Sequence, residues 1–372
     1  MAKNDVAVLD FGSGKLTLVV GKRTVNNNFI ITASSDIEYA GFMDGEFIEE
    51  DELYNVINQA VQEVQSVLNK PLNCLYVGVP SEFCEVSCKR VTKDYGKKIV
   101  LNNKKIDELF IDADSNIISN THTVINISPV CYTLDGTNIT FNPLDCYAKS
   151  IDVDLCFVLA DDRFISLVGR ILKDLKIREI EYVSSILAEG QYLLDGEIRD
   201  QGALLVDCGY LTTTITYFNG EGIVELKNFP MGGAHITAGL CENLNLPYSV
   251  AEQVKQKLLI SVKATGIDSY DVYRSNRIEK VSSQKANELA LEVIDSIVNG
   301  VLEEINRFEE IPSEHECVYL TGGGISYLKG IEYYMSSVLQ RKVQVIAPRP
   351  LKLRKPDLSS IIGLLDAALK ME

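Results

Sequence analysis

The stretch VAVLDFGSGKLTLVVG, residues 6–21, contains the pattern that decides the fold. It predicts a short apolar strand that ends in Asp10, a glycine-rich turn, and a second strand rich in β-branched residues. The stretch ALLVDCGYLTTTITYFNG, residues 203–220, repeats this build, with Asp207 in the place of Asp10. Two copies about half a chain apart indicate an internal duplication into two similar lobes. The repeat alone also allows two unrelated strand–turn–strand units.

A third glycine-rich stretch, LTGGGISYLKG, lies at residues 320–330. We expect a strand, a turn made by Gly322, Gly323 and Gly324, and then a helix. Consecutive glycines let a backbone come close to a flat ligand, or open the N-terminus of a helix toward phosphate. Taken alone this signal is weak, because glycine-rich turns between a strand and a helix are common.

Length, charge and cysteine content restrict the class of protein. A chain of 372 residues is expected to form two or more domains. Its net charge of −16, from 52 acidic and 36 basic residues, repels nucleic acid and anionic lipid. We therefore expect no nucleic-acid partner. The nine cysteines show no CxxC pair and are expected to be reduced thiols instead of a zinc site or disulfide framework. No signal-like or membrane-spanning run is present, which favours the cytoplasm.

The three glycine-rich stretches together favour a site for a nucleotide and Mg²⁺. Successive backbone N–H groups in a tight turn form a concavity that binds anions. Ser13, Gly14 and Lys15 could supply it, with the Lys15 ammonium as a point charge. The Asp at the end of each apolar strand would reach Mg²⁺ through water molecules, since this ion tends to keep several of them. The alternative role of each Asp is that of a turn or cap residue.

This ordered set resembles the phosphate-1, phosphate-2 and adenosine motifs of the actin superfamily. The motifs stand at residues 10–15, at 207–209 with Thr213, and at 321–324. Within the superfamily the chain is most similar to the bacterial cell-division actin homologue FtsA, over nearly its whole length. The resemblance implies an α/β, actin-like two-lobed fold of duplicated ribonuclease-H-like domains, with an FtsA-type inserted α/β subdomain.

The resemblance also implies where the parts of this fold begin and end. The lobe I core is expected to combine residues 1–82, 160–198 and 357–372. The lobe II core is expected to combine residues 199–240 and 300–356. The inserted subdomain is expected at residues 83–159, and a small subdomain of lobe II at residues 241–299.

By the same resemblance, two groups of residues would contact ATP or ADP with Mg²⁺. Those expected at the phosphates and the metal's waters are Asp10, Gly12, Ser13, Gly14, Lys15, Asp207, Gly209, Thr212 and Thr213. Those expected at the adenosine are Gly232, Gly233, Lys255, Gly322, Gly323 and Gly324, with Lys257 as the alternative to Lys255. Asp10 and Asp207 would hold the metal only through water, and no catalytic residue is implied.

Two positions depart from the family's pattern. The phosphate-2 turn usually has glycine where this chain has Leu211, whose side chain is expected to intrude where backbone should meet a phosphate. The first connector between the lobes commonly begins Glu-Pro, and that Glu helps to place the attacking water. This chain has Val183 and Ser184 at those places. Both departures should weaken hydrolysis more than binding, so we expect a slow or absent ATPase.

The resemblance implies a cytoskeletal adaptor in bacterial cell division. Such a protein polymerises head to tail and recruits the tubulin homologue FtsZ to the inner face of the membrane at the division site. The insertion would form half of the filament contact, with spare apolar surface on an alternating strand at residues 151–159. Arg274, Arg277 and Lys280 would face the acidic peptide of FtsZ, or else belong to a solvated loop.

The residues alone leave open how the chain reaches the membrane and which function it has. FtsA carries an amphipathic membrane-binding helix beyond the point where this chain reaches Glu372. Contact with the membrane is therefore expected to be indirect, or through a tail absent here. A scaffold of pilus assembly similar to PilM, and a small-molecule kinase of the same superfamily, are the alternative functions.

Overall fold

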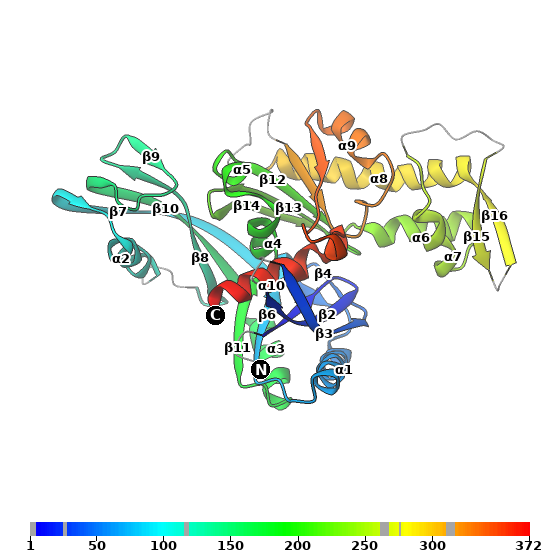
Figure 1. The fold of residues 1–372 in the computed structure, drawn as a ribbon. Coiled ribbons are helices and arrows are strands. Elements are labelled where there is room, and N and C mark those ends of the chain that lie inside the picture. Colours follow the sequence, from blue (N-terminus) through cyan, green and yellow to red (C-terminus); the bar gives the residue numbers. More distant parts are fainter. Residues whose placement is uncertain (1–4, 25–27, 115–118, 261–267, 275–276, 310–316) are drawn as a thin grey trace.

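The computed structural model describes residues 5–24, 28–114, 119–260, 268–274, 277–309 and 317–372. Figure 1 shows two lobes, one above the other, with helices α4 (Ser185–Leu193) and α10 (Ser359–Met371) between them. One subdomain extends on the left of this view and another on the right. The chain therefore has four parts around a central junction.

Lobe I is built on a five-stranded sheet with the order β11-β6-β1-β2-β3. Its strands are β1 (Val6–Phe11), β2 (Lys15–Arg23), β3 (Phe29–Glu38), β6 (Cys74–Val79) and β11 (Glu179–Ser184). Strands β1, β2 and β3 are antiparallel neighbours, whereas β6 runs parallel to β1 and β11 parallel to β6. Every residue of β1 is buried, because helices cover both faces of the sheet.

The helices of lobe I bury apolar stripes against this sheet. Helices α1 (Glu50–Leu68) and α3 (Asp162–Asp174) pack on one face, and α4 and α10 on the other. The apolar stripe of α1 consists of Leu53, Val56, Ile57, Ala60, Val61 and Val64, which are all buried. The remaining short elements are β4 (Phe42–Met43), β5 (Glu46–Phe47), η1 (Ser81–Phe83) and α5 (Gly196–Asp200).

Lobe II repeats the sheet of lobe I. Its order is β14-β13-β12-β17-β18, with β12 antiparallel to β13, β13 antiparallel to β14, and β17 and β18 parallel to β12. The strands are β12 (Ala203–Cys208), β13 (Thr213–Asn219), β14 (Gly222–Phe229), β17 (Val318–Thr321) and β18 (Val343–Val345). Order and directions match those of lobe I strand for strand, so the predicted duplication is confirmed.

Helices and a hairpin complete lobe II and its small subdomain. They are α6 (Gly233–Leu244), α7 (Tyr248–Lys255), β15 (Ser269–Arg274), β16 (Arg277–Ser282), α8 (Ser283–Ile305), α9 (Ile331–Leu339), η2 (Leu351–Leu353) and η3 (Pro356–Leu358). One apolar cluster runs from β12 through α6, α7 and α8 to the β15–β16 hairpin. The small subdomain is thus continuous with the core of lobe II.

The insertion is a sheet with the order β7-β10-β8-β9 and one helix. Its elements are β7 (Cys84–Val100), α2 (Asn103–Asp114), β8 (His122–Leu134), β9 (Asn138–Thr140) and β10 (Tyr147–Asp161). Strand β10 is longer than the predicted run. The prediction of spare apolar surface on it is wrong: Ile151, Val153, Leu155 and Phe157 are 0% exposed in the insertion's own core. The alternate side chains Cys156, Val158 and Ala160 join the core of lobe I.

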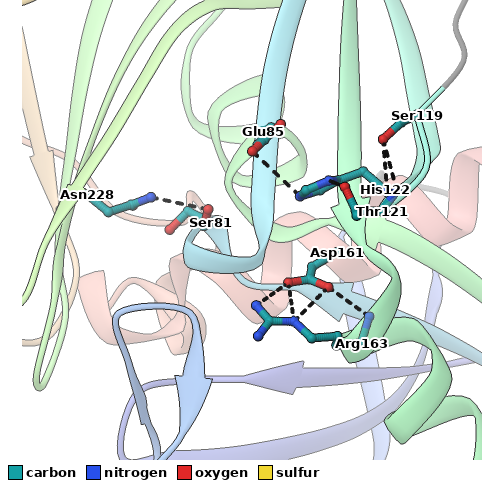
Figure 2. A network of polar contacts seen from close by, with 8 residues as sticks. All are labelled: Ser81, Glu85, Ser119, Thr121, His122, Asp161, Arg163 and Asn228. Carbon is teal, nitrogen blue, oxygen red and sulfur yellow. Dashed lines mark hydrogen bonds and ion pairs between the residues drawn. The ribbon is translucent and has the colours of Figure 1, made fainter.

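Where the insertion meets lobe I, polar side chains fix the ends of its strands (Figure 2). His122 Nε2 lies 3.6 Å from a carboxylate oxygen of Glu85, which joins β8 to β7. Asp161 caps α3 by accepting the backbone N–H of Arg163 at 2.8 Å, and it also pairs with that guanidinium. The contacts of Asp161 lie where β10 passes into α3.

The helix predicted directly after the three glycines is displaced. The chain makes turns from Gly322 onward, and α9 begins only at Ile331. Two hydrogen bonds account for this: the N–H of Gly324 donates to the carbonyl of Cys208 at 2.7 Å, and the hydroxyl of Ser326 donates to the carbonyl of Thr321 at 2.8 Å. These bonds fold the segment back onto the end of β12. None of the helices among the described residues is long and apolar enough to cross a membrane.

Candidate nucleotide site

The two lobes enclose a cavity of ≈ 540 Å³. This volume lies in the usual range for small-molecule sites. The turns after β1, β12 and β17 line it, together with parts of α4 and α7. The predicted residues that meet there are Asp10, Gly12, Ser13, Gly14, Lys15, Asp207, Gly209, Thr212, Gly233, Lys255, Gly322, Gly323 and Gly324.

Two predicted residues shape the cavity from behind instead of lining it. The hydroxyl of Thr213 is directed away, donating to the carbonyl of Met231 at 2.7 Å. Gly232 directly precedes α6. A Cβ atom added to this glycine would lie only 2.6 Å from the carbonyl oxygen of Gly209, so the position is closely packed. Direct contact with a ligand in the cavity is therefore not expected for either residue.

The two duplicated turns are closed by the same hydrogen bond. In lobe I the N–H of Gly12 donates to the carbonyl of Lys15 at 2.9 Å, and in lobe II the N–H of Gly209 donates to that of Thr212 at 2.9 Å. The duplication thus extends into the site. The ammonium of Lys15 lies 3.3 Å from Asp36, so it faces a carboxylate at the cavity's edge.

Both turns contact each other across the cavity. The backbone N–H of Leu211 donates to Ser13 Oγ at 3.0 Å. The ring of Tyr210 covers Gly14, where a Cβ would lie 2.4 Å from that ring. The hydroxyls of Tyr210 and Tyr248 are 2.7 Å apart. These contacts close one side of the cavity between the lobes.

A second bridge between the lobes lies near the insertion. The hydroxyls of Ser81 and Thr214 are 2.6 Å apart, and Thr214 also donates to the side chain of Asn228 at 2.8 Å. The amide of Asn228 donates to the carbonyl of Ser81 at 3.2 Å (Figure 2). Residues from η1, β13 and β14 thereby connect the two lobes.

The third glycine-rich turn is packed too tightly for any other residue. Gly322 has φ +85°, and a Cβ there would lie 2.1 Å from Asp207 Oδ1. At Gly324 a Cβ would lie 2.4 Å from the carbonyl oxygen of Gly209. The three motifs therefore touch one another, and a ligand held by one is within reach of the others.

The strand-end aspartates lie beneath these turns, Asp10 buried and Asp207 half-buried. Asp10 is 8% exposed and accepts a hydrogen bond from the hydroxyl of Ser185 at 3.1 Å. Burial raises the pKa of Asp10, against the smaller lowering effects of Ser360, Ser185 and Lys15. Burial and the charge of Asp10 raise the pKa of Asp207 to about 7. Both carboxyl groups therefore lack a counter-charge that matches their burial.

The structure distinguishes between the two lysines considered for the adenosine. Lys255 lines the cavity, with its ammonium 2.8 Å from Glu252 and 3.2 Å from the carbonyl of Gly233. Lys257 instead donates to the backbone carbonyl of Asp271 in β15. Lys255 is the one that a ligand in the cavity can meet.

The carboxylates suit a hydrated cation. No group of three or more His, Cys, Asp or Glu side chains in the described part of the chain is arranged to hold a bare metal ion. Mg²⁺ commonly keeps several waters and takes carboxylate oxygens at a distance. One buried and one half-buried carboxylate, on different lobes and beside backbone N–H groups, thus fit Mg²⁺ with a polyphosphate better than a metal alone.

Comparison with known proteins agrees with this geometry. A model of the family described as "Cell division protein FtsA" matches residues 204–363. The cell division protein FtsA of Bacillus subtilis is 21% identical over 384 residues, which cover 100% of this chain and 85% of that protein. The predicted resemblance to FtsA is confirmed.

Solved structures show the same fold for this FtsA-like chain. The PilM–PilN type IV pilus biogenesis complex matches with a TM-score of 0.65 at 16% identity, covering 98% of each chain. MreB5 of Spiroplasma citri bound to AMPPNP matches with a TM-score of 0.59 at 12% identity, covering 100% of this chain and 98% of that one. The fold is actin-like.

The two departures from the FtsA pattern that the sequence predicted lie differently in the structure from what was expected. The side chain of Leu211 is absent from the lining of the cavity, so the expected intrusion is wrong; its backbone faces Ser13. Tyr210 occupies that side instead. Val183 is buried, and Ser184 caps α4 by accepting the N–H of Leu187 at 3.4 Å. The first connector thus presents no acid at its start.

Sequence reasoning missed several residues that line the site. The main ones are Glu189 on α4, Tyr39, Tyr210, Tyr248, Asp357 and Ser360. For Glu189 a signal existed, because it is the one charged residue in the otherwise uncharged run SSILAEGQYLL, residues 184–194. The others lie in turns and helix starts whose place at the cavity depends on how distant segments pack.

Proposed function

We propose that this chain binds ATP or ADP with Mg²⁺ between its lobes and acts as an actin-like scaffold in bacterial cell division. The observation that carries this proposal is the convergence of Asp10 and Asp207, each at the end of a duplicated strand, on one cavity lined by three glycine-rich turns. Similarity to FtsA over the whole chain supports the role in division.

Hydrolysis in this scaffold is slow or absent. A fast ATPase needs a base or a positioned side chain that orients the attacking water. The connector position where the FtsA family commonly has Glu is taken by buried Val183. Nucleotide then serves as a structural element that holds the lobes together.

Self-association is the second part of the proposal. A double-helical filament of MamK, TM-score 0.55 and 13% identical, has the same fold. In this chain the far end of the insertion exposes Ile139 (70%), Tyr147 (69%), Leu144 (41%) and Phe141 (37%). Apolar side chains gathered on one projecting end favour a contact with a second copy, and a head-to-tail contact of this kind propagates.

The division partner is proposed to bind the opposite end of the molecule. Arg274, Arg277 and Lys280 lie exposed on the β15–β16 hairpin, and Arg274 pairs with Glu279 at 3.6 Å. A basic hairpin on a chain of net charge −16 suits an acidic peptide such as that of an FtsZ-like partner. The scaffold would then work at the inner face of the membrane, reached indirectly or through a further segment.

Sedimentation and electron microscopy with nucleotide and lipid test this function. Like-charged subunits repel within a Debye length of ~8 Å at physiological salt. Polymer should therefore increase with salt or Mg²⁺. Polymer that dissolves as salt rises would contradict the charge argument. Monomers that bind a partner peptide tightly without any polymer would favour a PilM-like scaffold, and ATP turnover that depends on a small hydroxyl acceptor would favour a kinase.

A further inference from the structure

Glu189 is a buried carboxyl group in the cavity that the predicted site does not use. It is 1% exposed and lies on α4, one turn after Ser185, whose hydroxyl bonds Asp10. Its Oε1 atom is buried and has no hydrogen-bond partner among the residues that the structure describes. A buried acceptor without a partner is uncommon and costly, so this oxygen marks a place for a missing donor.

The backbone of Glu189 is held in place from two sides. A Cβ at Gly363 of α10 would lie 2.6 Å from the Cα of Glu189, so the two central helices touch at this point. A Cβ on the next residue, Gly190, would lie 2.0 Å from the ring of Phe218 in β13. Helices and strands from both lobes therefore fix where the carboxyl group starts, and it cannot move out of the cavity by a shift of α4.

Glu189 lies within electrostatic reach of both strand-end aspartates. Burial, then the charge of Asp207, then that of Asp10 raise its pKa well above the ordinary value. Across the described residues, no Lys, Arg or His forms an ion pair with any of the three acids. Three acids share one buried cavity, and the basic side chains that line it, Lys15 and Lys255, are paired with Asp36 and Glu252.

We propose that Glu189 is a third carboxylate of the Mg²⁺ site and holds one of the ion's water molecules through Oε1. This inference rests on the proposed nucleotide function and deepens it. A water bound to Mg²⁺ is a strong hydrogen-bond donor, which is what the unpartnered oxygen lacks. Contact through water agrees with the described residues, which form no cluster for a bare ion.

The third carboxylate affects how strongly the binding of nucleotide depends on the binding of Mg²⁺. Without the cation, Asp10, Asp207 and Glu189 offer a triphosphate no attraction, and any of them that is ionised repels it. With it, all three attract the complex. Glu189 should therefore make binding more strictly dependent on Mg²⁺ than two aspartates alone would.

The test compares Glu189→Gln with the whole wild-type chain, using Mn²⁺ as a paramagnetic probe in place of Mg²⁺. Metal affinity is measured by electron paramagnetic resonance in the presence of ATP, and ATP affinity is measured separately in EDTA. Outer-shell partners of a metal contribute about 10-fold to 100-fold in metal affinity. We expect Glu189→Gln to lower Mn²⁺ affinity by about 10-fold or more, while ATP affinity in EDTA stays equal or rises.

Controls separate this inference from folding and from the proposed function. Glu197→Gln removes the same charge on α5, where the side chain is exposed, and should match the wild type. The melting temperature of Glu189→Gln without metal should stay close to that of the wild type, since burial already favours the neutral acid there and an amide of the same size replaces it. Wild-type Mn²⁺ affinity in Glu189→Gln, or an equal loss of ATP binding with and without metal, would overturn the inference alone. No ATP binding by the wild type would overturn the proposed function as well.

Discussion

The hydroxyl oxygen of Ser13 in lobe I accepts a hydrogen bond of 3.0 Å from the backbone N–H of Leu211 in lobe II. This bond joins the two copies of one duplicated turn across the cavity. A backbone N–H in a tight turn is also the kind of donor that a phosphate oxygen takes. The free protein thus uses for closure a donor that a nucleotide would use for binding.

Substituting Ser13→Ala should expose the amide of Leu211 in the free protein. The amide has no other acceptor across the cavity, so its hydrogen exchange should become faster than in the wild type. Adding nucleotide with Mg²⁺ should restore protection in both, because a phosphate oxygen then accepts the bond. Hydrogen exchange followed at this turn measures it. Equal protection in the two free proteins would show that Ser13 does not hold the turn.

Gly324→Ala should weaken nucleotide binding and lower stability. The new Cβ would lie 2.4 Å from the carbonyl oxygen of Gly209, a backbone atom that cannot rotate away. Forcing atoms into packed sites costs about 1–3 kcal/mol, so denaturant midpoint and affinity should both fall. Gly196→Ala is the matched control, since nothing lies within 4 Å of its Cβ. Identical behaviour of the two variants would refute the packing of the third turn.

Phosphate release should be orders of magnitude slower than the ~10 s⁻¹ of a typical enzyme. The reason is the absence of an acid at Val183, and not the side chain of Leu211, which lies outside the cavity. Leu211→Gly should therefore leave the preference for triphosphate over diphosphate unchanged. Rapid phosphate release by the chain without a partner would contradict this explanation. Tighter binding of triphosphate by Leu211→Gly would instead support a steric effect of the Leu211 side chain.

Asp161→Ala should destabilise the chain at neutral pH and less so in acid. The side chain caps α3, and loss of an N-cap typically costs ~1 kcal/mol. Hydrogen bonding to Arg163 lowers the pKa of Asp161, so its stabilising effect is present above the unfolded value of about 3.9. The effect is lost as pH falls through the lower folded value. Chemical unfolding at neutral and strongly acidic pH measures it, with exposed Asp174→Ala as control; a pH-independent difference would contradict the linkage.

Whether a site residue could be predicted from the sequence depends on how far along the chain its contact partners lie. Asp10 and Asp207 were predictable, because each ends a local strand–turn–strand unit that occurs twice. For Glu189 the sequence held only a weak signal, one charge in an uncharged run, because its surroundings include Gly363, which lies far along the chain in α10. An acid inside a helix ordinarily indicates an exposed face. Residues whose neighbours come from other segments therefore escaped prediction.

The same distinction explains the errors in the fold. Alternation along residues 151–159 correctly indicated a strand, but it could not show that both faces are covered, because the second cover comes from lobe I. Likewise the three glycines correctly indicated a turn. Their hydrogen bond to Cys208 in β12, which delays the following helix, joins residues that are distant in sequence. The predicted domain boundaries stay a prediction.

Binding of an adenine nucleotide is the most direct test of the proposed site between the lobes. A fluorescent ATP analogue is titrated into the wild type, Asp10→Ala and the control Asp174→Ala, each with Mg²⁺ and with EDTA. The account predicts saturable binding to the wild type and the control, and a loss in Asp10→Ala that is larger with Mg²⁺ than in EDTA. No saturable binding to the wild type at millimolar nucleotide would contradict it, and so would equal losses in Asp10→Ala under the two conditions.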